Sequence, residues 1–392
     1  MTSRRYRRRT MSRSTLAMGA TAAVLVAGGA AFALSSATDD GGGTAGTAPD
    51  LGAGTGTGPG TGPGTAPGTT PGTTPGTEPE KTPGKKPGNG AGEAANARFA
   101  PYIDTSLHAP YDMVGTAKKT GVKEFTLGFV SPGGGCTPKW GGRTGLGADK
   151  VARQTQALRA EGGDIRVSFG GQAGSELALA CSSVDKLTAA YSQVVDRFKL
   201  TKVDFDIEGK ALENAAASTR RAQAIAALQK QNPGLDVSFT LPVMPTGLTR
   251  DGAELVADAR KNGVKVSAVN IMAMDYGSSF DGDMGRYAID AATATQKQLK
   301  RALGLSDAAA WKTVAVTPMI GVNDVKNEIF TVDDATELVR FARTKGLGKL
   351  SMWSATRDKQ CAGGTQATAS AICSSVEQGA LAFTKALGGY RG

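Results

Sequence analysis

Histidine is almost absent from this 392-residue chain, whose single imidazole belongs to His108. One histidine cannot form the clusters that bind zinc, and it gives little basis for a Ser-His-Asp triad. The chain also has no lysine- or arginine-rich run interleaved with aromatic residues, and six of its basic residues fall within the first 13 positions. The net charge of +10 therefore does not indicate nucleic-acid binding, and no nucleic-acid partner is expected.

Apolar residues are sparse between positions 38 and 95, where the sequence is a Gly/Thr/Pro tract. Such a tract cannot bury enough surface to fold, so a disordered linker is expected there. Residues 1–37 combine an arginine-rich start, the apolar run "LAMGATAAVLVAGGAAFAL" and small residues, which is the pattern of a secretory signal peptide. The apolar run is nearly long enough to span a membrane, so an uncleaved anchor is the alternative.

Either interpretation exports the rest of the chain, which is expected to be secreted or tethered at the cell surface. Contact with a membrane is expected only if the N-terminal segment stays uncleaved. In an exported domain the four cysteines indicate two disulfides, for which three pairings are formally possible. Cys361 and Cys373 would close a short local loop, and Cys136 and Cys181 would then join two neighbouring loops, so we expect these two pairs.

Eight runs of strand-forming residues alternate with longer segments of helical periodicity from residue 96 onward. The expected strands are residues 98–104, 124–130, 164–170, 202–208, 235–241, 266–274, 313–320 and 349–354. This alternation predicts an α/β fold for residues 96–392, a single (β/α)8 TIM barrel without a large insertion subdomain. A doubly wound open sheet is the alternative, but no Gly-rich phosphate loop follows the first strand.

The fourth expected strand carries an unusual series of acidic residues in the sequence "KVDFDIEG". Because side chains alternate along a strand, Asp204, Asp206 and Glu208 share one face, while the apolar residues between them share the other. Like charges this close raise the pKa of at least one carboxyl group, which suits general acid–base chemistry. A metal site is the competing use and a structural role is a third. Cations need ligands from several directions, however, and no second acidic cluster is evident, so no metal or other cofactor is expected.

Polar and aromatic residues also follow other strands, at the end of a barrel where active sites lie. Asp275 and Tyr276 come after the sixth expected strand, and Trp353 lies in the eighth. Glu208 is the most distal acid of the fourth strand and would reach furthest into a cleft. Asp206 beside it is poorly placed to attack a sugar from the opposite face.

Four segments together resemble the family-18 glycoside hydrolases, and among these the exported bacterial chitinases. They are "VDFDIEG", "VSFGG" (167–171), "VNIMAMDYG" (269–277) and "LSMWSATRD" (350–358). The resemblance covers about residues 98–390. The last three acids of the family signature D-x-x-D-x-D-x-E match Asp204, Asp206 and Glu208, whereas the first position holds Thr201.

The resemblance implies retaining, substrate-assisted and endo-acting hydrolysis of the β-1,4 N-acetylglucosamine linkages of chitin or chito-oligosaccharides by a monomeric catalytic barrel. Glu208 would protonate the leaving oxygen and later activate water. Asp206 would hold the acetamido N–H, and Asp204 would share its proton. Ser168 and Gly170 match the family's S-x-G-G element and are expected near the substrate.

The sixth strand departs from the family's M-x-Y-D pattern, because Met274 stands where the tyrosine would be. We expect Tyr276, two positions on, to donate to the acetamido carbonyl, and Asp275 to contact the sugar or the surroundings of the acid. Trp353 is expected to form the floor of the sugar site. Trp140 either extends the cleft or packs within its own loop.

Two other functions are open on the same barrel. An endo-β-N-acetylglucosaminidase acting on N-glycans uses similar chemistry, and a non-hydrolytic sugar-binding protein is the alternative from another class. The presence of Glu208 disfavours the binding protein, because such relatives typically lose the terminal glutamate. The absence of a 60–80-residue insertion between the seventh and eighth strands favours an open cleft and endo-acting cleavage.

Overall fold

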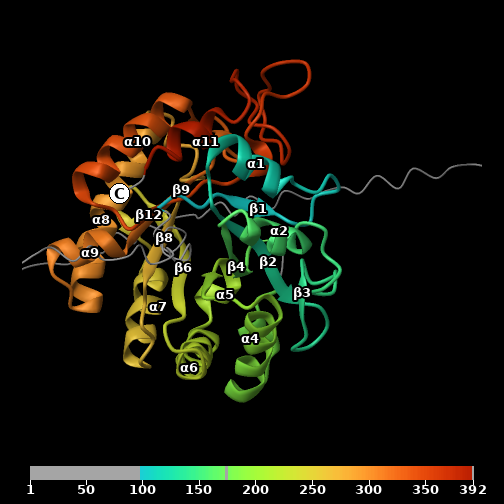
Figure 1. The fold of residues 1–392 in the computed structure, drawn as a ribbon. Helices are drawn as coiled ribbons and strands as arrows, with labels where there is room; N and C mark the ends of the chain where they lie inside the picture. Colours follow the sequence, from blue (N-terminus) through green and yellow to red (C-terminus); the bar gives the residue numbers. More distant parts are fainter. Residues whose placement is uncertain (1–97, 173–174, 391–392) are drawn as a thin grey trace, which may run out of the picture. The chain divides into compact units, whose positions relative to one another are not determined.

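The computed structural model describes residues 98–172 and 175–390, in which eight parallel strands surround one axis (Figure 1). The strands are β1 (Tyr102–Asp104), β2 (Glu124–Pro132), β4 (Asp164–Gly170), β5 (Lys202–Asp206), β6 (Asp236–Met244), β8 (Ala268–Ala273), β9 (Val314–Pro318) and β12 (Lys349–Leu350). Each strand pairs with the next in this order. All eight strands expected from the sequence are present.

Hydrogen bonds between the two ends of this series close the barrel. Leu350 N–H donates to the carbonyl of Arg98 at 2.8 Å, and Ala100 N–H donates to the carbonyl of Leu350 at 3.1 Å. Tyr102 N–H also donates to the carbonyl of Met352 at 3.1 Å. The predicted (β/α)8 fold is therefore confirmed, and the doubly wound sheet is excluded because its edges would not meet.

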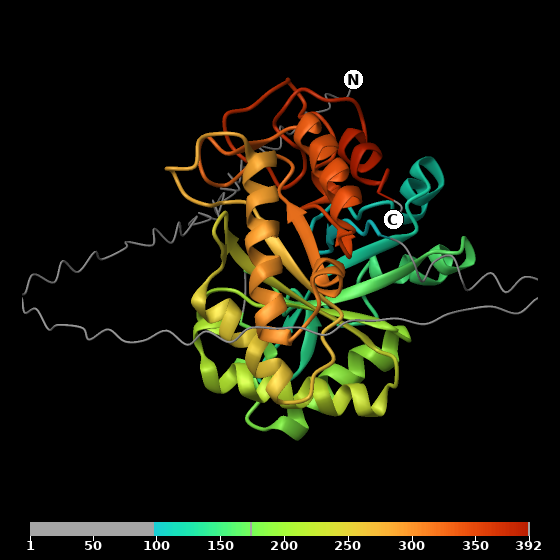
Figure 2. The ribbon, with the colours of Figure 1, turned by 90° about the vertical axis from the view of Figure 1, so that its left-hand side faces the viewer.

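Helices connect the strands and cover their outer side (Figures 1 and 2). The main ones are α1 (Met113–Thr120), α2 (Thr155–Ala160), α4 (Val184–Phe198), α6 (Ala215–Gln231), α7 (Arg250–Lys261), α8 (Met284–Leu303) and α10 (Val332–Lys345). Shorter ones are α3 (Leu177–Ala180), α5 (Gly209–Glu213), α9 (Asp307–Thr313) and α11 (Ala382–Leu387). Figure 2 shows α8 and α10 side by side along the outside of the strands.

Local sequence sets where the long helices begin and end. Ser183 caps α4, and Thr331 forms a capping box with Asp334 at the start of α10. Gly304 and Gly346 end α8 and α10 in the left-handed conformation, which glycine adopts without steric cost.

Short strand pairs extend the loops beyond the barrel. β3 (Pro138–Trp140) pairs with β2, and β7 (Gly247–Leu248) pairs with β6. β10 (Gly321–Val322) and β11 (Ile329–Phe330) form a separate two-stranded sheet between β9 and α10. These additions are small, in agreement with the prediction that no large subdomain is inserted.

An aromatic row on the outer face of the barrel decides which side of β5 faces inward. Phe205 pairs in register with Phe169 of β4 and Phe239 of β6, and its ring lies 5.2 Å and 5.9 Å from theirs. Tyr191 of α4 packs edge-on against the first two rings. All four side chains are buried, so the hydrophobic effect holds this face outward and turns the two aspartates of β5 into the barrel.

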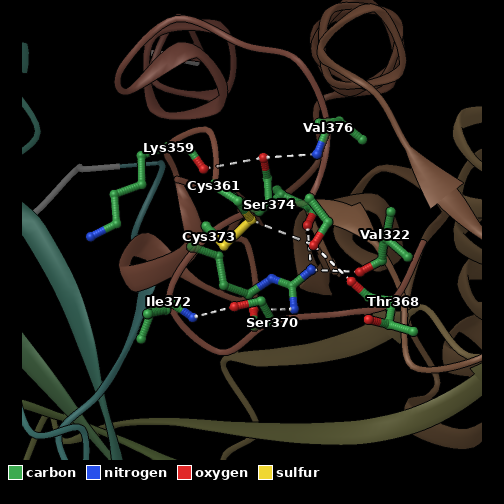
Figure 3. Close-up of a disulfide and its surroundings, with 12 residues drawn as sticks. Val322, Lys359, Cys361, Thr368, Ser370, Ile372, Cys373, Ser374 and Val376 are labelled. Atoms are coloured by element: carbon green, nitrogen blue, oxygen red, sulfur yellow. Dashed lines mark hydrogen bonds between the residues drawn. A yellow bond between two sulfur atoms is a disulfide. The ribbon is translucent and has the colours of Figure 1, made fainter. Parts of the chain in front are cut away.

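Both predicted disulfides are present, Cys136–Cys181 and Cys361–Cys373. Figure 3 shows the second pair closing a loop in which Ser374 donates to the carbonyl of Lys359. No helix in residues 98–172 and 175–390 is long and apolar enough to cross a membrane. The predictions for residues 1–37 and 38–95 concern a part of the chain that lies outside the described residues.

Candidate active site

Asp204 lies inside the barrel with its carboxylate surrounded by hydroxyl groups. Ser238 donates to Oδ1 at 2.5 Å, whereas Ser168 at 2.7 Å and Tyr102 at 2.9 Å donate to Oδ2. The hydroxyl of Thr240 lies 3.0 Å from each oxygen. Because these donors come from β1, β4 and β6, they fix Asp204 relative to three neighbouring strands.

Asp206 and Glu208 form a pair of carboxyl groups whose protonation is linked. Burial raises the pKa of Asp206 well above its ordinary value, and the charges of Glu208 and Asp204 raise it further. Burial also raises the pKa of Glu208, to about 7, with a further contribution from the charge of Asp275. The pair therefore holds a proton near neutral pH.

One carboxylate oxygen of Asp206 is buried without a hydrogen-bond partner in the part of the chain that the structure describes. Its side chain is 4% exposed, and Oδ1 has no hydrogen-bond partner among the described residues. A buried carboxylate oxygen without a donor is costly, so a bound N–H or O–H group would stabilise it. The charge of Asp204 contributes to the raised pKa of Asp206, and the sharing of a proton between the two stays a prediction.

Glu208 lies at the start of α5, two residues beyond the end of β5, although the sequence predicted that the strand would continue to residue 208. β5 ends at Asp206, and Glu208 is the residue that precedes the helix, with an extended backbone. It is partly exposed, whereas Asp204 and Asp206 are buried. Glu208 is therefore the acid of the series that solvent and substrate can reach.

Ser168 and Gly170 support the site from below and do not line it, which corrects the prediction that they contact substrate. Ser168 is fully buried and donates to Asp204. Gly170 has φ 105°, and a Cβ there would lie 2.1 Å from the carbonyl oxygen of Asp206. The N–H of Gly171 donates to the same oxygen at 3.1 Å. This close approach holds the end of β4 against the end of β5.

Tyr276 is also placed differently from the prediction, because β8 ends at Ala273 and strand alternation stops there. Asp275 adopts φ 51°, which turns the chain before Tyr276. The Tyr276 ring packs 5.8 Å from Phe280 and 6.0 Å from Tyr287, and its buried hydroxyl has no hydrogen-bond partner among the described residues. A contact between Tyr276 and a sugar carbonyl does not fit this position.

The neighbouring residues Met274 and Asp275 stay at the end of the barrel. Met274 is partly exposed, and its N–H donates to the carbonyl of Met272. Asp275 is exposed, accepts a hydrogen bond from Val325 N–H at 2.9 Å, and is close enough to raise the pKa of Glu208. Asp275 therefore lies in the surroundings of the acid, as expected.

The two tryptophans have different environments. Trp353 follows β12, is partly exposed, and stacks on Phe129 with ring centres 5.6 Å apart. Its position at the end of the eighth strand suits the floor of a sugar site. Trp140 is 2% exposed, and its indole N–H donates to the carbonyl of Leu146. Its ring also packs edge-on against Phe198 at the end of α4, with ring centres 5.7 Å apart, so its assignment to the cleft is wrong.

Several polar residues of the site were not identified from the sequence. Tyr102, Ser238 and Thr240 bind Asp204, and Asn270 donates to Thr240 at 3.0 Å. The alternation of Ser238 and Thr240 with Val237 and Phe239 was a usable signal, because polar residues on the inner face of a barrel strand need partners.

Glu328 was also missed, and the sequence around it gave no signal. It is fully buried, and its carboxylate accepts the N–H groups of Tyr276 at 3.1 Å and Gly277 at 2.8 Å. Burial raises the pKa of Glu328 to about 7. Glu328 thereby anchors the loop that presents Asp275 to the acid.

A metal centre is not formed by the residues that the structure describes. Among them, no group of three or more histidine, cysteine, aspartate or glutamate side chains is arranged to hold an ion. The acidic residues at the end of β5 and the start of α5 instead form a series in which the Asp204 carboxylate is fixed by hydroxyls and the protonation of Asp206 and Glu208 is linked.

A proton-holding carboxyl pair at the C-terminal end of a barrel strand is typical of a glycoside hydrolase. The structure is similar to the catalytic domain of a hyperthermophilic chitinase from Pyrococcus furiosus, with a TM-score of 0.68 and 34% identity, over 76% of this chain and 97% of that chain. A mutant of active domain 2 of the Pyrococcus furiosus chitinase, complexed with chito-oligosaccharides, matches with a TM-score of 0.69 and 33% identity, over 77% and 97% of the chains.

Two curated relatives agree with this likeness. The chain is 37% identical over 278 residues to the probable bifunctional chitinase/lysozyme of Escherichia coli strain K12, covering 66% of this chain and 31% of the relative. It is 36% identical over 278 residues to endochitinase 11 of Metarhizium anisopliae, covering 66% and 52%. The chain thus spans about a third and about half of the length of these relatives.

No protein-family model matches the chain. Even so, it aligns with nearly the whole of the Pyrococcus furiosus catalytic domain at 34% identity. The chain belongs to the family-18 glycoside hydrolases, the GH18 chitinase family. The resemblance inferred from the four sequence segments is confirmed.

Proposed function

We propose that this chain hydrolyses the β-1,4 linkages between N-acetylglucosamine units of chitin or chito-oligosaccharides, by endo-acting cleavage. The observation that carries the proposal is the Asp206–Glu208 pair, which holds a proton and has one unpartnered, buried oxygen. The names of the relatives support the substrate class, because they describe chitinases and one complex with chito-oligosaccharides.

Glu208 is the general acid of the proposed reaction. A carboxyl group with a pKa of about 7 is largely protonated in mildly acidic solution and about half protonated at pH 7, so it can donate to the leaving glycosidic oxygen. Loss of the proton leaves a carboxylate that can then activate water. One residue thus acts in both halves of a retaining reaction.

Asp206 orients the nucleophile, which is the acetamido group of the sugar itself. Its free Oδ1 is an acceptor for the acetamido N–H, and the hydrogen bond directs the acetamido oxygen toward the anomeric carbon. The C1–O bond to the leaving group breaks as the acetamido oxygen bonds to C1, which gives an oxazolinium ion. Water then gives a proton to the Glu208 carboxylate and attacks C1 with retention, as the bond between C1 and the acetamido oxygen breaks. The carboxylate charge that remains in the acidic series stabilises the cation.

The remaining residues position these groups. Hydroxyls of Tyr102, Ser168, Ser238 and Thr240 hold Asp204 beneath the pair, and Glu328 holds the loop of Asp275. Trp353 offers a partly exposed ring on which the apolar face of a sugar can stack. Tyr276 has no part in this scheme.

The chemistry is tested with substrates that differ only in the N-acetyl group. We expect hydrolysis of chitohexaose and no detectable hydrolysis of the corresponding glucosamine hexamer, because the free amine cannot form the oxazolinium ring. Asp206→Ala should lower kcat by several orders of magnitude with a smaller change in KM. Mass-spectrometric trapping of a glycosyl ester on Asp206 would contradict the mechanism even if chitin were the substrate.

Substrate class is tested separately. Release of product from colloidal chitin is compared with release from a high-mannose glycopeptide, since the two bonds require similar chemistry. Preference for the glycopeptide would reassign the chain to endo-β-N-acetylglucosaminidase activity. Product analysis on long chito-oligosaccharides distinguishes endo-acting from exo-acting cleavage.

We further propose that the chain is exported and acts as a monomer outside the cell. Two disulfides within residues 98–390 are typical of proteins in an oxidising compartment. The arginine-rich, apolar start of the sequence supports a signal peptide or anchor in residues 1–37, followed by a linker in residues 38–95. N-terminal sequencing of protein recovered from culture medium and from membranes tests cleavage.

A further inference from the structure

A polar cavity of about 270 Å³ lies at the N-terminal end of the barrel, opposite the end that carries Glu208. Its wall is formed by residues at or near the beginnings of strands, and Tyr102 and Asp204 form its inner end. The charged side chains that line it are four cations and two carboxylates: Arg98, Arg166, Lys312, Lys349, Asp204 and Asp236. The lining is therefore more cationic than acidic.

Arg166 has hydrogen-bond donors that the protein does not use. Its side chain is 5% exposed, and Nη1 donates to the carbonyl of Val203 at 2.8 Å, to Asp236 at 2.9 Å and to Ser238 at 3.1 Å. Among the described residues, no acceptor lies within hydrogen-bond distance of Nε or Nη2. The Glu124 carboxylate is 4.0 Å from Nη2. Neither nitrogen is among the buried polar atoms without a partner, so both donors are open to the cavity, where an anionic acceptor can bind them.

The other cations are only partly neutralised. Lys349 pairs with Glu124 at 2.5 Å, but Glu124 is shared with Lys202 at 2.9 Å. Burial and the charge of Arg166 lower the pKa of Lys349 in spite of Glu124. Lys312 has no carboxylate within 4.0 Å in the described part of the chain.

Arg98 is the fourth cation that lines the cavity. Its Nη1 donates to the carbonyl of Leu347 at 2.9 Å, and no carboxylate of the described residues forms an ion pair with it. Two of the four cations that line the cavity therefore have no carboxylate partner, and a third has spare donors. Planar guanidinium groups together with ammonium groups are the side chains that bind tetrahedral oxyanions.

We propose that this cavity is a binding site for a small tetrahedral oxyanion, a phosphate or a phosphomonoester. The anion would accept hydrogen bonds from Arg166 Nε and Nη2 and pair with Lys312 and Lys349. This site lies on the far side of Asp204 from the sugar site, and the proposal does not depend on the proposed hydrolysis.

Isothermal titration of the full chain with inorganic phosphate tests the site directly, with sodium chloride at matched ionic strength as the control. We expect one phosphate per chain and a rise in Tm of roughly 3–5 °C at a phosphate concentration of about 100 Kd. A sugar 6-phosphate in place of phosphate shows whether the ligand is the free anion or a monoester. An equal rise in Tm with chloride, or no bound phosphate, overturns the proposal.

Variants then locate the binding. Lys312→Gln should weaken phosphate binding at least tenfold, and Lys349→Gln should do the same. Lys230→Gln is the matched control, because it removes one positive charge from an exposed position near the end of α6. Phosphate binding that is unchanged in Lys312→Gln and Lys349→Gln places the anion elsewhere and refutes this site. Lys312 is exposed, so its replacement is compatible with folding.

Discussion

Glu208 differs from the other two acids of its series in being reachable from solvent while keeping a pKa of about 7. We expect Glu208→Gln to lower kcat on chito-oligosaccharides by at least roughly 10²–10⁴-fold, because the amide cannot donate the proton. Affinity for chito-oligosaccharides, measured by titration calorimetry, should stay close to that of the unmodified chain. Glu213→Gln, an exposed glutamate five residues on, is the control and should keep full activity. Turnover of Glu208→Gln within tenfold of the unmodified enzyme would assign the acid to another residue.

Burial is the main cause of the raised pKa of Glu208, and the charge of Asp275 extends the pH range over which that acid stays protonated. The charge of Asp275 contributes to the raised pKa of Glu208, so its removal should lower that pKa. An acid works in its protonated form, and activity is therefore expected to fall as pH rises through about 7. In Asp275→Asn the alkaline limb of kcat/KM should move to lower pH, while the side-chain oxygen can still accept from Val325 N–H. An alkaline limb that stays in place would show that Asp275 does not act on Glu208.

The junction of β4 and β5 shows how one strand places the chemistry of the next. Gly170 approaches the carbonyl oxygen of Asp206 so closely that a Cβ would lie 2.1 Å away, and its φ of 105° disfavours any other residue. We expect Gly170→Ala to lower both Tm and activity, because the end of β5 must shift. Gly145→Ala is the control, since its Cβ would meet nothing within 4 Å and its φ is not in the left-handed region. Normal activity in Gly170→Ala would mean that the carboxylate positions tolerate this shift.

The end of β8 shows the limit of strand alternation as a guide to side-chain direction. The sequence extends the strand to residue 274 and so puts Met274 and Tyr276 on one face. The strand ends at Ala273, and Glu328 holds the following N–H groups in a turn. A carboxylate from a distant loop supplies these hydrogen bonds, and no local pattern near residue 274 encodes it.

Titratable groups at the two ends of the barrel should change the free energy of unfolding in opposite directions as pH rises. At the sugar end, the pKa values of Glu208 and Glu328 are raised from 4.5 to about 7, so the folded state holds protons that the unfolded state releases. Their contribution is present below pH 4.5 and is lost as pH rises to about 7, on the order of 2–3 kcal/mol each. At the other end, burial opposes ionisation of Glu124, but the charges of Lys349, Arg166 and Lys202 lower its pKa to about 2. That contribution is present above pH 4.5 and is lost as pH falls.

We therefore expect Tm to be highest near pH 5 and to decline on both sides, as measured by calorimetry between pH 2.5 and 8. Glu208→Gln should reduce the decline between pH 4.5 and 7, because the amide does not titrate. Glu213→Gln should leave that decline unchanged. A Tm that rises steadily from pH 5 to pH 8 would contradict these proton affinities.

The barrel, its eight strands and the acidic series from Asp204 to Glu208 could be predicted from the sequence. These features depend on local periodicity: apolar alternation fixes a strand, and the aromatic row of Phe169, Phe205 and Phe239 leaves only one face for Asp204 and Asp206. The family could also be predicted, because four segments close to strand ends resemble those of the family-18 glycoside hydrolases.

Tertiary structure alone decided which partners those acids have. Asp204 is held by hydroxyls from three other strands, Asp275 is presented by Glu328 from 53 positions further on, and Trp140 is buried against Phe198. The cationic cavity beneath Asp204 likewise brings together the beginnings of strands that lie far apart in the chain. Such contacts form because closure of the barrel places distant strand ends beside one another. The spacing of residues along the chain does not predict which strand ends will meet.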